Sequence, residues 1–410
     1  MIPVLAILTT HPIQYQVPIW QALAKDGRVP FEVWYLTDFG TQPSLDRQFG
    51  RTFSWDIDTL AGYPHRFIRT AEGANPASFW KCRLRERLRD RLRQSGAKAL
   101  WIQGWQVAAY WQAVWEAKAA GVELWLRAES NDLAPNVPPW KRPLKQFALG
   151  RMLGRVDRFL CIGAANKRLY QRFGVPDSRF YSAPYAVDNE RFARQGLALR
   201  PGRMELRRQW GIGDGAFCVL FCGKFMKKKR PLDLVEAARS LISDGRLPNI
   251  QLLFAGSGEL ERELRRACHV VFDAETEGSY DSASLVPSGS PDALPPASFT
   301  GFLNQTEISR AYVAADCLVL PSDHGETWGL VVNEALASGL PCLVSEACGC
   351  AEDLASDRFS FPMGNPGALA DKLVRLHSKP SSGSKQVLPS VDESVTAISR
   401  AYSDLTKRLK

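Results

Sequence analysis

The sequence predicts an α/β protein with two similar, doubly wound domains. Short apolar segments alternate with amphipathic segments in the first part of the chain, and the same alternation starts again near residue 217. Segments such as VLAILT (4–9) and FCVLFCG (217–223) are rich in branched and aromatic residues and flanked by turn formers, which is typical of buried strands. Strand–helix alternation favours a parallel sheet with helices on both faces. We therefore expect two Rossmann-like domains that face each other across a cleft.

The first domain is expected to span residues 1–197. Its predicted strands are the apolar segments 4–9, 31–36, 99–103, 122–127 and 158–163. Its predicted helices are the amphipathic segments 17–25, 79–94, 106–119 and 164–173. Ten of the twelve tryptophans lie in the first 140 residues, so the two domains are expected to have different kinds of core.

The second domain is expected to span residues 205–378, after a linker at RQGLALRPGR (194–203). Its predicted strands are 217–223, 250–256, 317–322 and 341–345. Its predicted helices are 231–243, 258–267, 306–314, 329–338 and 366–377. Residues 269–297 are rich in Ser, Pro, Gly and acidic residues, which predicts a surface insertion.

A last helix is predicted over residues 390–410. Ser390 and Glu393 fit a capping box, and the apolar residues that follow recur at helical spacing. An apolar stripe must pack on another surface, and we expect this helix to return to the first domain.

The composition excludes several classes of protein. A hydrophobic content of 45% with 23% charged residues is that of a globular chain, and the net charge of +9 predicts affinity for anions. No segment reaches the roughly 18 consecutive apolar residues of a membrane span, and the N-terminal segment resembles a buried strand more than a signal peptide. The nine cysteines lack zinc-ligand spacing, so we expect a cytoplasmic protein with free thiols. The pair Cys348 and Cys350 leaves a small redox or metal site as an alternative.

Two glutamates mark the segment richest in candidate functional residues, DHGETWGLVVNEALASGLPCLVS (323–345). Glu326 precedes a predicted helix and Glu334 lies about two turns into it, so both are expected along one face. The free N–H groups at such a helix start suit a phosphate or sugar oxygens, and paired carboxylates can bind vicinal hydroxyls. The alternative is that both are solvated helix acids.

Two strand–turn–helix segments earlier in the chain carry further candidate residues. GKFMKKKRP (223–231) follows a strand and opens a helix, which places Gly223, Lys224 and Lys229 where lysines can neutralise a diphosphate. FAGSGELERE (254–263) is a second strand–glycine turn–helix, with Gly256 and Gly258 but without the third glycine of a dinucleotide motif. A solvated basic turn remains the alternative for the lysines.

In this order, the motifs closely resemble the C-terminal domain of family-4 glycosyltransferases of the GT-B fold. Glu326 and Glu334 match the E-x7-E motif of that family, and the resemblance is strong over residues 215–360. THPIQYQVPIWQALA (10–24), RAES (127–130) and the region 162–192 resemble the N-terminal domain of one branch.

The resemblance implies retaining transfer of a sugar from a nucleotide-diphosphate sugar, with no bound metal or other cofactor. It implies that Lys224 and Lys229 hold the diphosphate, although position 224 is commonly Arg in the family. Glu334 would bind the ribose hydroxyls, and Glu326 the donor sugar. The remaining donor contacts would come from backbone N–H groups of Thr327, Trp328 and Gly329, and from Gly223, Gly256, Gly258 and Phe302 around the phosphates and base.

Four residues of the first domain are candidates for catalysis or acceptor binding. His11 follows the first predicted strand and could orient or deprotonate the acceptor, or could simply anchor a loop. Glu129 follows the strand VELWLR (122–127) and could hold the donor sugar or assist the acceptor, although many family members carry His near this position. Gln14 and Tyr15 are weaker acceptor candidates. Asp56 and Asp58 form a DxD pair typical of a metal site in another glycosyltransferase fold, which the two-domain pattern opposes.

Two basic segments suggest an anionic membrane surface as a partner. KCRLRERLRDRLRQ (81–94) and WKRPLKQFALGRMLGRVDR (140–158) are both arginine-rich and amphipathic. Alternatively, the leucine stripe of 81–94 packs on its own sheet. Lipid binding would fit a glycan or lipid-linked acceptor and a location at the inner membrane face. No nucleic-acid motif is present. The rival functions are a nucleotide-sugar epimerase of the same fold and a catalytically silent nucleotide-sugar-binding protein.

Overall fold

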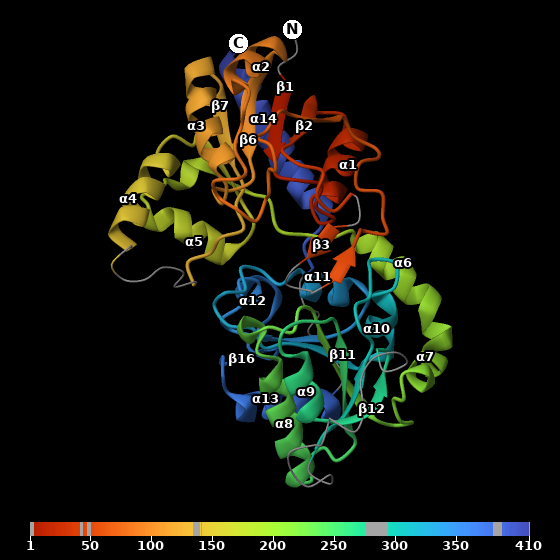
Figure 1. Ribbon diagram of the computed structural model, residues 1–410. Coiled ribbons are helices and arrows are strands. Elements are labelled where there is room, and N and C mark those ends of the chain that lie inside the picture. Colours follow the sequence, from red (N-terminus) through yellow and green to blue (C-terminus); the bar gives the residue numbers. More distant parts are fainter. Residues whose placement is uncertain are drawn as a thin grey trace. The chain divides into compact units, whose positions relative to one another are not determined.

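The computed structural model describes residues 4–41, 44–46, 51–133, 140, 142–275, 294–379 and 388–409 (Figure 1). These residues form two compact units. The first contains the described residues of 1–44, 53–187 and 389–410, and the second contains those of 45–52 and 188–388. A two-stranded sheet joins β3 (Ser44–Asp46) and β4 (Arg51–Phe53).

The first unit is built on a seven-stranded parallel sheet. Its strands, in spatial order, are β5 (His65–Phe67), β2 (Phe31–Tyr35), β1 (Val4–Thr9), β6 (Ala97–Ile102), β7 (Glu123–Leu126), β8 (Arg158–Cys161) and β9 (Phe180–Ser182). The strand order reverses between β1 and β6, which makes this the topological switch point.

Alternation along β1 divides the core of the first unit into two layers. Ala6 and Leu8 face one layer, while Leu5 and Ile7 face the other. The helices of the first layer are α2 (Leu88–Gln94), α3 (Ala108–Ala120), α4 (Arg142–Leu153) and α5 (Ala164–Arg172), followed by the short η2 (Asp177–Arg179). The helices of the second layer are α1 (Val17–Asp26) and α14 (Val391–Leu409). Four tryptophans of this unit, Trp20, Trp34, Trp101 and Trp125, are fully buried.

The C-terminal helix α14 packs within the first unit. Its stripe of apolar residues joins the core layer that contains α1. Ser394 donates a hydrogen bond to the Pro184 carbonyl at 2.7 Å, and Tyr181 donates one to Asp404 at 3.0 Å. The predicted capping box forms, because Ser390 Oγ accepts the Glu393 N–H and Glu393 accepts the Ser390 N–H.

The second unit repeats the architecture with another seven-stranded parallel sheet. In spatial order its strands are β12 (His269–Asp273), β13 (Pro296–Phe299), β11 (Ile250–Ala255), β10 (Phe217–Cys222), β14 (Cys317–Leu320), β15 (Cys342–Ser345) and β16 (Ser360–Phe361). Here the strand order reverses between β10 and β14. The described helices are α6 (Asn189–Leu199), η3 (Arg200–Gly202), α7 (Arg203–Gln209), η4 (Lys227–Lys229), α8 (Pro231–Ser243), α9 (Glu261–Arg266), α10 (Ser309–Ala314), α11 (Leu330–Ala337), α12 (Ala351–Leu354) and α13 (Pro366–Ser378).

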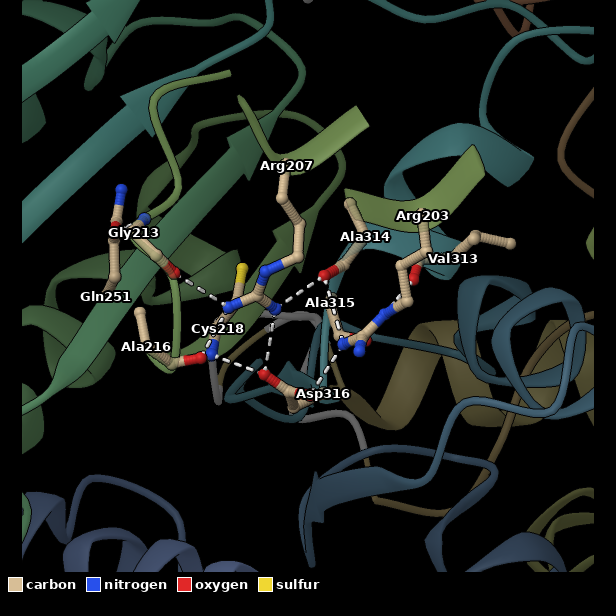
Figure 2. A network of polar contacts seen from close by, with 10 residues as sticks. All are labelled: Arg203, Arg207, Gly213, Ala216, Cys218, Gln251, Val313, Ala314, Ala315 and Asp316. Atoms are coloured by element: carbon tan, nitrogen blue, oxygen red, sulfur yellow. Dashed lines mark hydrogen bonds and ion pairs between the residues drawn. The ribbon is translucent and has the colours of Figure 1, made fainter. Parts of the chain in front are cut away.

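The amino-terminal edge of the second sheet is held by a buried arginine (Figure 2). The Arg207 guanidinium donates to the carbonyl groups of Ala314 at 3.0 Å and Ala216 at 2.5 Å, and to Asp316 at 3.2 Å. Asp316 also accepts from the Cys218 N–H, at the start of β10, at 2.8 Å. This network fixes α7 to the start of β10 and β14.

Three expectations from the sequence differ from the structure. The segment 194–203, predicted as a linker, is helical, because the amphipathic α6 packs on α10 and α11 of the second unit. The helix predicted over 79–94 contains only α2, since Arg85 and Ala71 make backbone hydrogen bonds between residues 69–71 and 83–85. The ends of the insertion predicted at 269–297 are strands β12 and β13, and its centre, 276–293, lies outside the described residues.

Among the described helices, none has the length and apolar character needed to cross a bilayer.

Candidate functional site

Most candidate donor-binding residues lie at the carboxyl edge of the second sheet. Gly223 and Lys224 follow β10, the turn Gly256–Gly258 follows β11, and Phe302 comes soon after β13. Residues 322–329 connect β14 to α11. Because the parallel strands all end at this edge, and β10 and β14 form the switch point, the sheet brings these loops to the place where α/β sheets bind ligands.

The turn after β11 requires its two glycines. Gly256 and Gly258 have φ values of 141° and 153°, which only glycine adopts readily. A Cβ atom at Gly258 would lie 2.6 Å from the Phe225 carbonyl oxygen. At this close approach, the Gly223 N–H donates a hydrogen bond to the Ala255 carbonyl, and the Phe225 N–H donates one to the Ser257 carbonyl, both at 2.9 Å. The two loops are therefore locked together as one surface.

The lysine turn joins the loop that carries Glu326. Asp323 N–H donates to the Lys228 carbonyl at 2.8 Å, and Lys229 Nζ forms an ion pair with Glu326 Oε2. The two side chains of this pair are only 16% and 12% exposed. Burial alone would lower the pKa of Lys229, but the Glu326 carboxylate outweighs it and raises that pKa. Lys229 is therefore a buried cation held at the carboxyl edge of the sheet.

Glu334 lies in the second turn of α11 and is only 4% exposed. Tyr312 Oη donates to one carboxylate oxygen at 2.5 Å. The other oxygen, Oε1, is buried and has no hydrogen-bond partner among the described residues. Burial raises the pKa of Glu334, against the opposing effects of the Tyr312 hydrogen bond, of Arg191 and of the Gln305 side chain near this carboxylate. The carboxylate thus has one oxygen available for a hydroxyl donor.

The start of α11 depends on Gly329 and Trp328. Gly329 precedes the helix with a φ of 108°, and a Cβ atom there would lie 2.5 Å from Leu320 Cδ2. The Trp328 indole is buried and donates to Asn333 Oδ1 at 2.9 Å. Its side chain therefore has a packing role, and only its backbone is a candidate for ligand binding. Thr327, Lys224 and Phe302 are half-buried at the same edge.

Cys348 and Cys350 are buried beside this loop. Cys348 Sγ lies 3.8 Å from the carbonyl oxygens of Leu320 and Ser322. Burial raises the pKa of both thiols well above the usual value, which disfavours the thiolate that redox chemistry needs. The described residues contain no group of three or more His, Cys, Asp or Glu side chains placed to hold a metal ion.

His11 lies at the carboxyl end of β1, in the first unit. Its Nδ1 is 2.9 Å from Thr10 Oγ1, and its ring packs edge-on against Phe39 with 5.3 Å between centroids. Burial lowers the pKa of His11 to about 4, so the imidazole is neutral near pH 7. Gln14 is buried and Tyr15 is half-buried on the same loop.

Glu129 is exposed beyond the end of β7, where it accepts a hydrogen bond from Tyr185. The Tyr185 ring is buried, and the Arg127 guanidinium stacks over it at 4.7 Å from the centroid. Arg127 is 1% exposed, and in the described part of the chain the single hydrogen bond that its guanidinium donates is to the Pro184 carbonyl at 3.5 Å. The sequence did not single out Arg127, Tyr185 or Tyr312.

The DxD alternative has a local explanation. Asp58 accepts hydrogen bonds from the backbone N–H groups of Leu60 at 2.9 Å and Ala61 at 3.1 Å. This carboxylate therefore stabilises a turn.

Comparison with known proteins identifies the family. The model for "Glycosyl transferases group 1" matches residues 216–379, and that for "Glycosyl transferase 4-like domain" matches residues 20–186. The crystal structure of Anabaena HepE in complex with UDP has the same fold, with a TM-score of 0.64, 13% identity, and coverage of 99% of this chain and 98% of that one. The chain belongs to the family-4-like glycosyltransferases of the GT-B fold. Sucrose-phosphate synthase from Thermosynechococcus elongatus also shares this fold, with a TM-score of 0.63, 17% identity and 99% coverage of both chains.

This glycosyltransferase also matches curated relatives over about half of its own length. It is 41% identical over 220 residues to the sulfoquinovosyl transferase of Arabidopsis thaliana, covering 52% of this chain and 33% of that protein. It is 27% identical over 222 residues to an Escherichia coli protein named UDP-Gal:alpha-D-GlcNAc-diphosphoundecaprenol alpha-1,3-galactosyltransferase, covering 54% of this chain and 49% of that protein. The chain thus spans a third to a half of the length of these two relatives.

Proposed function

We propose that the chain is a retaining, metal-independent glycosyltransferase that moves a sugar from a nucleotide-diphosphate sugar to an acceptor. The observation that supports this most is the buried contact between Lys229 and Glu326 at the carboxyl edge of the second sheet. It brings a cation and a carboxylate from two loops to the start of α11. Those are the groups that a diphosphate and a sugar hydroxyl require.

In this proposal the fixed charges of the edge stabilise the leaving nucleoside diphosphate. Negative charge develops on the phosphates as the bond to the sugar breaks, and Lys224, Lys229 and the N–H groups at the start of α11 oppose it. When the diphosphate takes Lys229, Glu326 is released to accept hydrogen bonds from the donor sugar. The lysines would supply charge that a divalent ion supplies elsewhere.

Glu334 would bind the ribose. Its Oε1 atom is buried without a partner among the described residues, and an unsatisfied buried acceptor costs stability until a donor reaches it. A ribose hydroxyl is such a donor. The nucleotide class is supported by names of relatives and solved structures, among them HepE with UDP and glucose and a GDP-mannose-dependent mannosyltransferase.

We propose a glycan or lipid-linked acceptor and a role in polysaccharide assembly at a membrane. The diphosphoundecaprenol in the name of the E. coli relative supports a lipid-linked acceptor. His11 and Glu129, with Gln14 and Tyr15, are the residues we assign to the acceptor side. A neutral His11 can accept the proton of an acceptor hydroxyl, since the burial that lowers its pKa leaves the imidazole uncharged.

The test compares Lys229→Ala with Lys227→Ala, an exposed lysine of the same turn. We expect nucleoside diphosphates to raise the melting temperature of the wild type and of Lys227→Ala, but not of Lys229→Ala. With the donor that binds, Lys229→Ala should lose roughly 100-fold or more in turnover, and EDTA should leave the wild-type rate unchanged.

NMR of the product should show that the anomeric carbon has the same configuration as in the donor sugar. Equal rates in both lysine variants, or an inverted product, would contradict the assignment. Nucleotide binding without transfer to any acceptor would favour a silent nucleotide-sugar-binding protein, and isomerisation of the free donor would favour an epimerase.

A further inference from the structure

Helix α4 of the first unit (yellow in Figure 1) exposes large apolar side chains. Every residue from 142 to 147 is exposed, including Leu144 at 74% and Phe147 at 64%. Trp140, just before the helix, is 76% exposed. Among the described residues of the helix, the buried side chains are those of Leu149, Met152 and Leu153, near its C-terminal end. Its first half therefore presents apolar surface outward, which in a water-soluble fold marks an interaction site.

The same helix is basic. It carries Arg142, Lys145 and Arg151, and no acidic residue lies within Arg142–Leu153. Helices that lie in a membrane interface combine this composition with exposed Trp, Phe and Leu. The absence of acids distinguishes α4 from a solvated helix, in which acidic and basic residues alternate.

The basic and aromatic side chains form one continuous strip. The Arg151 guanidinium lies 5.6 Å from the Phe147 ring centroid, and Arg155 donates to the Arg151 carbonyl at 2.7 Å. The Arg155 guanidinium in turn lies 4.0 Å over the ring of Trp115, which is 58% exposed on α3. The strip therefore extends from α4 onto α3.

The other basic segment of this unit has the opposite arrangement. Leu84, Leu88 and Leu92 of the segment 81–94 are buried in the core layer beneath α2 and α3. Some of its arginine side chains are exposed, but its leucine stripe is already buried in the core of the first unit. That segment can attract an anionic surface, and Trp80 just before it is 75% exposed, but its leucine stripe is buried, whereas the stripe of α4 itself exposes Leu144 and Phe147.

We propose that a lipid face consisting of Trp115, Trp140, Leu144, Phe147, Arg151 and Arg155 docks this protein on an anionic phospholipid surface. The apolar side chains would enter the headgroup–acyl boundary while the arginines pair with lipid phosphates. The inference goes beyond the proposed transfer reaction, and it locates the membrane contact on α4 instead of residues 81–94.

The test is co-sedimentation of the full chain with vesicles of phosphatidylcholine alone or mixed with phosphatidylglycerol. We expect the wild type to pellet with the mixed vesicles only. The double variant Leu144→Ser, Phe147→Ser should lower the partition coefficient at least about tenfold, because it removes the inserted apolar area. Arg151→Glu should lower it by a similar factor and weaken its dependence on salt, because one of the cations that face the lipid phosphates is reversed.

The matched controls are Arg85→Glu with Arg93→Glu, on the other basic segment, and Leu197→Ser, an exposed leucine of the second unit. We expect the Leu197→Ser variant to bind as the wild type does, and the arginine controls to lose less than threefold. Binding that the arginine controls abolish, or that the α4 variants leave unchanged, would overturn the proposal. A wild-type dimer that the α4 variants convert to monomer would also overturn it, in favour of a second copy. Vesicle binding needs no nucleotide, so its failure is distinguishable from failure of the proposed reaction.

Discussion

The two edges of the second sheet bury polar groups in different ways. At the amino-terminal edge, Arg207 donates to three backbone carbonyl groups and to Asp316, and Asp316 also accepts the Cys218 N–H (Figure 2). At the carboxyl edge, Glu334 is equally buried but has one oxygen without a partner among the described residues. A buried group whose hydrogen bonds are complete contributes to stability, whereas an incomplete one lowers it until a ligand supplies the missing group.

A second buried arginine, Arg127 of the first unit, differs from Arg207 in a similar way. Arg127 follows β7 at the carboxyl edge, and its Nε atom has no partner in the described part of the chain. Arg207 and Arg127 are both nearly inaccessible to solvent, so burial alone does not distinguish a structural arginine from one at a ligand-binding edge. The number of hydrogen bonds does, since the Arg207 guanidinium donates four and the Arg127 guanidinium one among the described residues.

The largest effect is expected from Arg207→Met. Arg203 still donates to Asp316 and Ala314 after this substitution, so its main effect is to leave the Ala216 carbonyl without the guanidinium, which should cost about 1–3 kcal/mol of unfolding free energy. Urea denaturation measures the loss, and Arg208→Ala, on the exposed side of α7, should change it by less than about 1 kcal/mol. Nucleotide affinity of the folded fraction should be unchanged. A large fall in affinity at full stability would break the comparison between the edges.

Glu334→Gln should have the reverse pattern, with a smaller effect. The amide retains an acceptor for Tyr312 but loses the charge that binds a ribose hydroxyl, so nucleoside diphosphate affinity should fall about tenfold. Stability near pH 7 should stay the same or rise, because burial already disfavours the carboxylate and raises its pKa. Isothermal titration and thermal melting measure the two quantities, with the exposed Glu346→Gln as the control. Lower stability with unchanged affinity would show that Glu334 is a structural group.

The sequence predicted the framework of this contrast because it depends on local patterns. Short apolar segments gave most of the strands, and parallel topology then brings Gly223, Gly256 and Glu326 to one edge without further information. The glycines were predictable for a related reason, since a strand that turns sharply against its neighbour needs the conformations that glycine permits.

The partners at that edge were not predictable from the sequence. Tyr312 and Glu334 lie 22 positions apart, and Lys229 and Glu326 lie 97 apart, so no periodicity links them. Periodicity also could not decide between the two basic segments. Both have an apolar stripe at helical spacing, but only the fold shows that Leu88 is buried and Phe147 exposed.

The smallest effect is expected for His11, at the carboxyl edge of the first sheet. It tests whether burial makes protonation of this imidazole unfavourable in the folded state. Burial lowers the pKa of His11 to about 4 from 6.5, so the folded state binds a proton less readily than the unfolded state. Stability from this group is complete above pH 6.5 and falls as the pH drops toward 4. NMR should show the His11 ring titrating near pH 4, and His11→Asn should lose stability less steeply than the wild type between pH 6.5 and pH 4. A His11 that titrates near 6.5 would mean that solvent reaches the ring. Protonation of this residue would then not destabilise the folded state.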